Sequence, residues 1–420
     1  MRDIHEWCMP CLVVLKTERH YVLKTKFYKG EIRLKRYCKD VDITDRDFIS
    51  NAVRDCISKK LTRKDTIKLF YEYSGLSYNY IYQIVKHDYT KGYVDGLIET
   101  VIDGIRQEII YQNYIVKPIH YQTKIDGNSG KVRQIGIQDV KQQLYDYIAT
   151  YGLWDLFVAK IGYYQCSALT GKGQIFGVKA LKSWVDDHHI RYAIQSDIRH
   201  FYDTIDRDIL KNMLRRDVKN EPLLHLTFFL IDTFDKGLAI GSYLSQLLAC
   251  YYLSLAYHYV TEQCYRIRKH KNGTQSRVNL VDHALWFADD CVILGSNLKD
   301  LKKAHKLYAQ FCKDKLHVEV KPEIKIIDLR TGHIDMMGYK VSRKNVTIRS
   351  SDFIRMRRNQ KRVEAYLGDY IPLNEARGFS SRSGALLHSD SKHYCKRTGA
   401  LETKQKCNEI ISRKTRRKAA

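Results

Sequence analysis

The sequence contains few prolines, few acidic residues and no long hydrophobic run. Of its 420 residues only 5 are proline, and 47 are acidic against 72 lysines and arginines. The longest apolar stretch, Leu247–Ala256, is too short to cross a bilayer, so no membrane partner is expected. The chain also lacks internal repeats with periods of about 20 to 50 residues and has no low-complexity linker, which argues against solenoids and propellers.

The cysteines lack the spacing of a structural metal site. The 11 cysteines are irregularly placed, and nothing at the N-terminus resembles a signal peptide. Cys8 and Cys11 form one Cys-x-x-Cys pair, but no second pair stands at zinc-finger spacing, which argues against a zinc site. We therefore expect free thiols and a cytoplasmic location.

Positive charge is what the sequence has in excess. The formal net charge is +25 and the isoelectric point is about 9.4. Because each phosphate neutralised by Lys or Arg releases counterions, this excess favours a nucleic-acid partner. A basic surface without such a role is the alternative. With 44% hydrophobic residues the chain should bury a core, and its length suits two or three subdomains.

Two adjacent acids interrupt a hydrophobic run near residue 290. Asp289 and Asp290 are flanked on both sides by apolar β-formers in the segment 285–294. Because burial of an unpaired carboxylate is costly, both acids are expected at a hairpin turn between two core strands. A solvent-exposed Asp-Asp turn without a function is the alternative.

A third acid stands at the end of another predicted strand. The β-run Tyr192–Gln195 leads to Asp197, and the aromatic residues Phe201 and Tyr202 follow four and five residues later. Carboxylates from two neighbouring strands can hold two Mg²⁺ ions roughly 4 Å apart, with Mn²⁺ as a substitute, for in-line nucleotidyl transfer. Mg²⁺ requires oxygen ligands, which aspartate supplies.

Strand and helix patterns alternate along the chain. A Gly-rich segment, 124–131, lies between the strand-like runs Ile119–Gln122 and Val132–Ile137 and predicts a hairpin. Helical patterns cover the segments 66–73, 78–86, 105–114, 140–157 and 244–264. This order predicts an α+β fold in which helices cover one face of a sheet.

These segments together resemble the prokaryotic reverse transcriptases of group II introns, diversity-generating retroelements and antiphage defence. The resemblance runs from about Tyr114 to about Tyr394, with five motifs in the family order. It implies a right-hand polymerase with fingers and palm subdomains at 106–345 and a helical thumb with a basic tail at 346–420. Residues 1–105 would form an N-terminal extension that binds RNA or a partner protein.

The resemblance also implies which residues bind metal and nucleotide. The metal ligands would be the three catalytic acids and one backbone carbonyl: Asp197, Asp289, Asp290 and Ile198. The dNTP would be bound by Lys131, Arg133, Phe201, Tyr202, Ile240 and Gly241. Lys131 and Arg133 would hold the triphosphate. The Tyr202 ring stands where the family excludes a ribose 2′-hydroxyl, with core packing as the alternative.

Template and primer contacts are implied as well, at Ser245, Gln246, Phe287, Gly338, Tyr339, Arg355 and Arg358. Ile240 and Gln246 replace the Gln and Pro of many relatives, and this form resembles diversity-generating enzymes. Phe287 stands where Tyr is commoner. Position 324 is Ile where relatives have a lysine that donates a proton to pyrophosphate, so this lysine is displaced, with Lys325 or Lys321 as the candidates.

The resemblance implies an RNA-directed DNA polymerase that copies a dedicated, structured noncoding RNA into cDNA, with antiphage defence as the expected setting. Error-prone synthesis in a diversity-generating retroelement and protein-primed or template-independent synthesis are alternatives. An RNA-binding splicing or scaffold protein with a vestigial polymerase site is an alternative of another class. The expected partners are the template RNA, the cDNA, dNTPs, and an accessory protein or a second copy. No segment resembles RNase H or an HNH nuclease.

Overall fold

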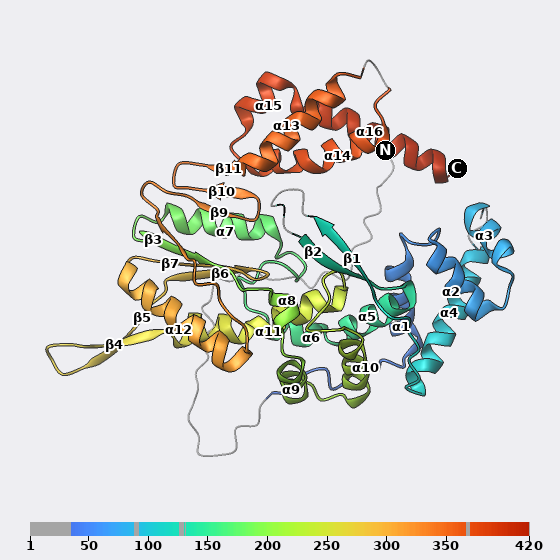
Figure 1. The fold of residues 1–420 in the computed structure, drawn as a ribbon, viewed down its shortest axis with the longest axis horizontal. Coiled ribbons are helices and arrows are strands. Elements are labelled where there is room, and N and C mark those ends of the chain that lie inside the picture. Colours follow the sequence, from blue (N-terminus) through green and yellow to red (C-terminus); the bar gives the residue numbers. More distant parts are fainter. Residues whose placement is uncertain (1–34, 88–91, 126–129, 131, 367–369, 420) are drawn as a thin grey trace. The chain divides into compact units, whose positions relative to one another are not determined.

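The computed structural model describes residues 35–87, 92–125, 130, 132–366 and 370–419, and the chain is an α+β protein (Figure 1). Its described α-helices are α1 (Arg46–Ile57), α2 (Lys64–Ser74), α3 (Tyr78–His87), α4 (Gly92–Ile110), α5 (Val140–Gly152), α6 (Trp154–Lys160), α7 (Gln174–Asp186), α8 (Phe201–Thr204), α9 (Arg207–Asp217), α10 (Glu221–Asp232), α11 (Tyr243–His258), α12 (Leu298–Leu316), α13 (Ser350–Glu364), α14 (Leu373–Ser383), α15 (Lys392–Thr398) and α16 (Ala400–Ala419). Its strands are β1 (His120–Ile125), β2 (Val132–Ile137), β3 (Tyr192–Ser196), β4 (Tyr265–Lys269), β5 (Gln275–Asn279), β6 (His283–Phe287), β7 (Asp290–Gly295), β8 (Lys325–Asp328), β9 (Ile334–Met336), β10 (Tyr339–Val341) and β11 (Val346–Ile348). A π-helical turn, η1 (Tyr259–Gln263), and a 3₁₀ turn, η2 (Gly384–His388), complete the set.

The first four helices pack together, and α1 and α2 also pack against α5. Their apolar faces bury Ile49, Phe70 and Val101 in the same core as Leu144 of α5. The helices predicted at 66–73 and 78–86 are confirmed as α2 and α3. The predicted boundary after residue 105 falls inside α4, whose buried side chains continue this core.

Of the elements predicted after residue 119, the hairpin is confirmed and two helices differ from the structure. The hairpin is confirmed: β1 and β2 pair antiparallel, from His120 opposite Ile137 to Ile125 opposite Val132. The single helix predicted over 140–157 is wrong, because the chain breaks at Leu153 into α5 and α6. The helix predicted over 244–264 ends as α11 at His258 and continues as the π-turn η1.

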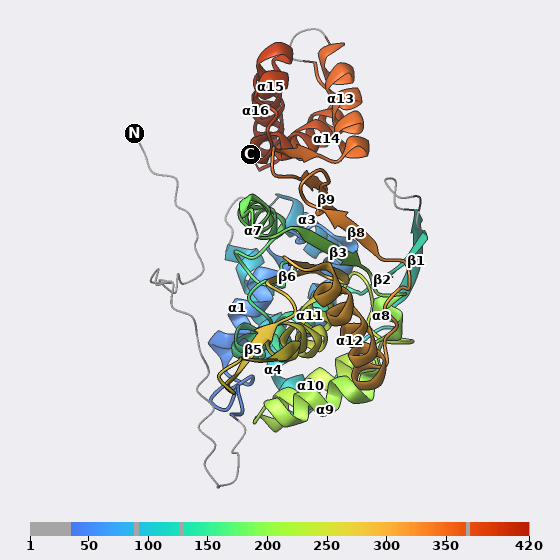
Figure 2. The same cartoon turned by 90° about the vertical axis from the view of Figure 1, so that its left-hand side faces the viewer.

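The central sheet has the strand order β6-β7-β3-β8, with every pairing antiparallel. On one face Trp286 packs against Tyr257 of α11 and Tyr308 of α12. On the other face Leu285 and Val292 share a core with α7 and with the small sheet of β9–β11 (Figure 2).

The expectation that helices cover only one face is therefore wrong. The physical reason lies in strands β6 and β7, whose continuous apolar runs must be buried on both faces. Helices α13–α16 follow as a bundle with buried side chains of its own, among them Val363 and Phe379. In the described part of the chain no helix is both long and apolar enough to span a membrane, and the nine cysteines found there are unpaired and buried. Cys8 and Cys11 lie outside the described residues.

Candidate active site

Strand register brings the three predicted acids to one end of the central sheet. β3 pairs with β7 so that Ser196 lies opposite Cys291, and continuing this ladder by one residue sets Asp197 opposite Asp290. Phe287 pairs with Asp290 across a tight turn, which leaves Ala288 and Asp289 as the loop. Ala288 adopts a left-handed φ of 55°, as such turns require. The hairpin predicted around the acids is thus confirmed.

The carboxyl groups at this end repel one another. Burial is the main reason that the pKa of Asp289 is raised to about 7, and a hydrogen bond with Asp197 and the charges of Asp197 and Asp290 contribute to this rise. Two carboxyl groups at hydrogen-bond distance must share a proton or a cation, because both cannot ionise freely there. Any cation placed here would lower the pKa of Asp289 again.

A lysine supplies a positive charge to this cluster. Lys321 donates a hydrogen bond from its ammonium group to Asp197, and its backbone N–H donates to the Asp197 carbonyl at 2.8 Å. Ile198, which follows Asp197 in the chain, forms a β-bridge with Val320, which precedes Lys321. Lys321 reaches Asp197 through this pairing of two segments far apart in sequence, which no local spacing could have revealed.

The acids suit a divalent metal by donor type and charge. Carboxylate oxygens are the ligands that Mg²⁺ prefers, and the mutual repulsion of Asp197 and Asp289 favours a cation between them. Within the described ranges, however, no group of three or more Asp, Glu, His or Cys side chains has the spacing of a formed metal site. In this structure Lys321 contributes the neutralising charge at Asp197.

Tyr202 belongs to the short helix α8. Burial raises the pKa of the Tyr202 hydroxyl, and the charges of Asp289 and Arg133 act on the same group. Its neighbour Phe201 is only 3% exposed and belongs to the core, so a nucleotide could meet Phe201 only through its backbone. Lys131, the other cation predicted for this site, lies outside the described residues.

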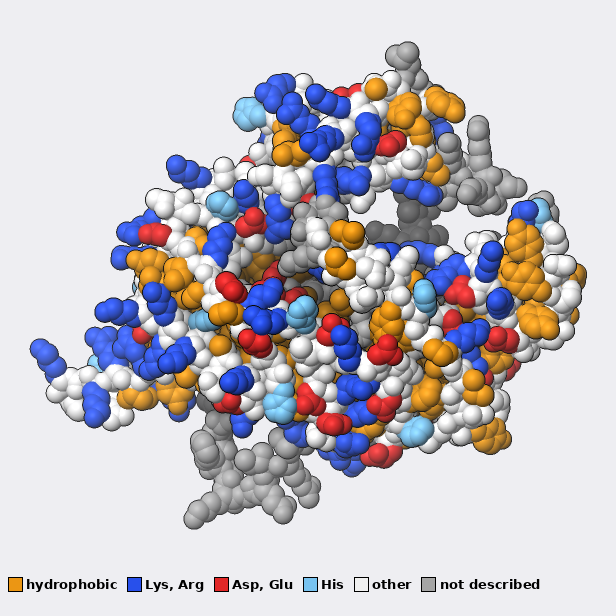
Figure 3. All heavy atoms as spheres, in the orientation of Figure 1, with side chains coloured by type: hydrophobic (Ala, Val, Ile, Leu, Met, Phe, Trp, Pro, Cys, Tyr) orange, Lys and Arg blue, Asp and Glu red, His pale blue; other side chains and the backbone are white. Residues whose placement is uncertain are grey.

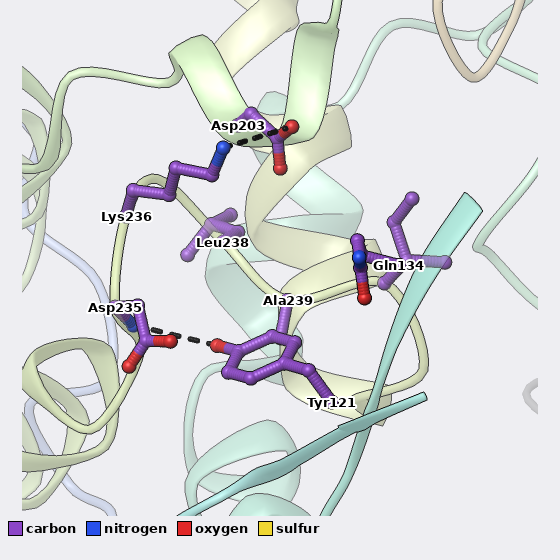
Figure 4. Close-up of a pocket in the computed structure, with 8 residues that line it drawn as sticks. Tyr121, Gln134, Asp203, Asp235, Lys236, Leu238 and Ala239 are labelled. Carbon is purple, nitrogen blue, oxygen red and sulfur yellow. Dashed lines mark hydrogen bonds and ion pairs between the residues drawn. The ribbon is translucent and has the colours of Figure 1, made fainter. Parts of the chain in front are cut away.

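The loop 235–241 fastens the β1–β2 hairpin at two points. The Gly136 N–H donates to the Ile240 carbonyl at 2.8 Å, and the Asp235 N–H donates to the Tyr121 hydroxyl at 3.4 Å. A cavity of about 320 Å³ lies between these points (Figure 4). Its lining consists of Tyr121, Gln134, Asp203, Asp235, Lys236, Leu238, Ala239 and Ile240. The loop thereby sets the position of the strand that carries Arg133.

Gly241 is the point of closest approach between this loop and β2. Its φ is +115°, and an added Cβ would lie 2.8 Å from the Gly136 carbonyl oxygen, a backbone atom. Gly241→Ala is expected to cost about 2 kcal/mol of stability through strain and to push β2 away from the loop. If the hairpin binds nucleotide, the KM for dNTP should rise roughly tenfold, as steady-state kinetics would show.

Gly273→Ala provides the matched control. Gly273 also has a left-handed φ, of +79°, but an added Cβ there meets no atom within 4 Å. This variant should share the backbone strain and leave the KM unchanged. Equal KM values in the two variants would contradict the role of the close approach at Gly241.

Helix α11 starts beside the site with a buried cap. Ser242 is its N-cap, accepts from the Ser245 N–H, and donates its hydroxyl to Asp146 at 2.6 Å. Ser245 itself is fully buried, so its side chain faces the core rather than a ligand. Gln246 is exposed and donates to the Ser167 carbonyl at 2.8 Å.

Asp146 should make stability depend on pH. Burial raises its pKa from 3.8 to about 7, so the folded state binds a proton that the unfolded chain releases between those values. Stability from this group is therefore lost as pH rises through that window. Asp146→Asn should become more stable than wild type by on the order of 3 kcal/mol between pH 4 and pH 8, measured by urea unfolding. Ser242→Ala, which keeps the acid, should retain the wild-type trend, and a pH-independent gain for Asp146→Asn would contradict this assignment.

A second cavity, of about 680 Å³, connects the acid turn with the C-terminal helices. Five of the predicted site residues line it: Phe287, Asp290, Gly338, Tyr339 and Arg355. Tyr339 is 2% exposed, so its side chain is a core group, and Arg358 is exposed without lining the cavity.

Sequence reasoning missed several polar residues of this cavity. They are Gln174, Arg349, Asp352, Arg382 and His388. Gln174 donates a hydrogen bond to the Met337 carbonyl beside Gly338, and Arg349 pairs with Asp335 at 2.7 Å. Only Gln174 had a local signal, since it begins a helix directly after a Gly-rich loop.

Comparison with models of known protein families gave no match, and neither did comparison with curated protein sequences. Among solved structures the chain is similar to telomerase from Candida albicans in complex with a TWJ fragment of telomeric RNA, with 10% sequence identity and a TM-score of 0.38. The match covers 70% of this chain and 54% of the telomerase chain, so the chain spans about half the length of that protein. A structural similarity with so low a TM-score does not indicate the function of this chain.

Proposed function

We propose that this protein is a magnesium-dependent, RNA-directed DNA polymerase of the reverse-transcriptase kind. One observation supports this proposal above the others: the β3–β7 register sets Asp197 beside the Asp289–Asp290 turn, and a large cavity opens next to that turn. The order of the sequence motifs supports it independently. In this proposal residues 106–345 are the fingers and palm, and 346–420 are the thumb.

The roles of the residues follow from their positions. Asp197, Asp289 and Asp290 would hold the Mg²⁺ ions, which supply charge neutralisation and activate an attacking hydroxyl. Arg133 would orient the triphosphate through its two-pronged guanidinium. The Tyr202 ring, on whose hydroxyl the charge of Asp289 acts, would leave no room for a ribose 2′-hydroxyl. Lys321 would balance the charge of Asp197 until the metal binds.

Primer extension tests this function directly. The full chain with Mg²⁺, dNTPs and a DNA primer on an RNA template should extend the primer, and extension should stop when the template or Mg²⁺ is omitted. Extension without template would instead indicate protein-primed or template-independent synthesis. No extension on any RNA template, with a folded protein, would contradict the proposal.

Antiphage defence is the setting we propose for this activity, with a structured noncoding RNA as template. The diversity-generating alternative is supported by the Ile-Gly-x-x-x-Ser-Gln form of residues 240–246. Sequencing the cDNA made in cells separates the two settings. Substitutions concentrated at template adenines would support diversification, and repeated or non-targeted products would support defence.

Two observations favour a scaffold with a vestigial site: Lys321 already neutralises Asp197, and the described residues contain no formed three-ligand cluster. A biological assay of Asp289→Ala combined with Asp290→Ala separates this function from polymerisation. Unchanged biological activity in that variant would favour the scaffold, and loss of activity would favour the polymerase.

A further inference from the structure

Strands β4 and β5 form a ribbon that neither the core nor the candidate active site uses. They pair antiparallel from Tyr265 opposite Asn279 to Lys269 opposite Gln275. Their loop is well bonded: the His270 N–H donates to the Thr274 carbonyl at 2.9 Å. The ribbon therefore has a defined shape and extends from the end of the central sheet (Figure 1).

Almost the whole ribbon is exposed to solvent. Every residue from Arg266 to Gln275 is exposed. Because no other element covers most of the ribbon, its surface is accessible to a ligand. Two contacts hold its base: Arg266 pairs with Asp300 of α12 at 3.4 Å, and the Arg277 guanidinium lies over the Tyr265 ring at 4.5 Å.

The ribbon itself carries charge of one sign. Residues 265–279 include five lysines and arginines and no acid: Arg266, Arg268, Lys269, Lys271 and Arg277. The adjoining start of α12 presents four exposed lysines: Lys299, Lys302, Lys303 and Lys306. Lys303 follows Asp300 by one helical turn and so lies on the side that faces the ribbon base. Figure 3 shows Lys and Arg side chains gathered over this region.

The ribbon lies away from the acids. Helix α11 begins near the candidate active site and has 16 residues, which corresponds to about 24 Å. The ribbon follows the other end of this helix, after η1. Strand β6 separates the ribbon from the acids in the same manner, because it starts just after the ribbon and ends at the acid turn. A ligand on the ribbon would therefore not occupy the catalytic cavity.

We propose that the β4–β5 ribbon and the start of α12 bind the phosphate backbone of double-stranded RNA. Charge complementarity favours a phosphate backbone as the ligand, because nine exposed cations lie on these two elements. The only large apolar side chain exposed on the ribbon is Ile267, which is 49% exposed. Protein interfaces are built around apolar anchors and are depleted in lysine, so an acidic protein fits this surface less well. Arg266 and Arg268 share one face of the ribbon, about 6.8 Å apart, and Lys269 and Arg277 share the other, so long cationic side chains can reach a phosphate backbone from either face. The choice of RNA over DNA rests on the proposed function, since a folded template would contain such stems.

Three cations at the loop end of the ribbon can be replaced to test RNA binding. Arg268, Lys269 and Lys271 are exposed, and replacing all three with Gln removes charge without touching the contacts at the ribbon base. The probe is a 20-base-pair RNA stem, titrated against the full chain at several salt concentrations. The triple variant is expected to bind about 10- to 100-fold more weakly at low salt, with the salt slope of log K reduced by about 2 to 3.

A second triple variant controls for net charge. Lys39, Lys219 and Lys344 are exposed elsewhere, and replacing them with Gln changes the net charge equally. Equal weakening in both variants, unchanged binding in the ribbon variant, or a loss confined to a duplex DNA probe would overturn the proposal. Primer extension on a short unstructured template should be unaffected by the ribbon variant. A wild-type protein without polymerase activity would contradict the proposed function but leave this binding test valid.

Discussion

Asp289→Asn should abolish RNA-templated primer extension while leaving the protein folded. We expect a loss of at least 1,000-fold in kcat, about 4 kcal/mol of transition-state stabilisation, because the variant lacks a charged metal ligand. Asparagine has the same shape as aspartate and can keep the turn between Phe287 and Asp290. It also removes the repulsion that raises the pKa of Asp289, so thermal stability near pH 8 should be equal or higher.

Asp328→Asn is the matched control for this loss. Asp328 lies in the neighbouring strand β8 opposite Tyr192, the first residue of β3, and thus at the other end of the same sheet from Asp197. Its interactions are with nearby Arg330. The control should retain full extension activity. If Asp289→Asn kept more than a tenth of the wild-type rate, the acids would not be the metal site and the polymerase proposal would fail.

The site could be predicted from sequence wherever local rules govern the structure. Two adjacent acids between apolar strands require a turn, and this requirement placed Asp289 and Asp290 correctly in a hairpin. The Gly-rich segment before Val132 gave the β1–β2 hairpin for the same reason. Both features depend on neighbouring residues, whose preferences can be read from the sequence.

Features that depend on distant contacts could not be predicted in this way. Lys321 reaches Asp197 only because two segments 124 residues apart pair side by side. The burial of Phe201, which was expected to contact nucleotide, likewise depends on tertiary packing that its spacing from Asp197 does not show.

The ribbon β4–β5 is a different case, because a local signal was present. Asn272-Gly273 is a strong turn pair, and it stands between two short runs that each alternate in character. The helical pattern predicted over 244–264 extends almost to this signal. A π-turn at Tyr259–Gln263 ends the helix, and the strand β4 starts two residues later at Tyr265.

If the protein is the polymerase proposed above, Tyr202→Ala should make it accept ribonucleotides. The Tyr202 backbone carbonyl accepts the Leu238 N–H at 2.8 Å, and its ring packs on Phe201 with centroids 5.7 Å apart, so the ring is held in a fixed position. The charges of Asp289 and Arg133 act on its hydroxyl, one from the predicted metal site and the other from the predicted triphosphate site. Removing it should reduce discrimination between dNTP and rNTP by about 100-fold, equivalent to about 2.7 kcal/mol.

The variant Tyr202→Phe distinguishes the contribution of the ring from that of its hydroxyl. Exclusion of a 2′-hydroxyl needs only the bulk of the ring, so this variant should keep wild-type discrimination in competition between dNTP and rNTP. Both variants must first show cooperative unfolding, because truncating a largely buried ring leaves a cavity. If Tyr202→Ala lowered kcat/KM for dNTP and rNTP by the same factor, the ring would serve core packing alone. If the phenylalanine variant also lost discrimination, the hydroxyl and not the ring would be the selecting group.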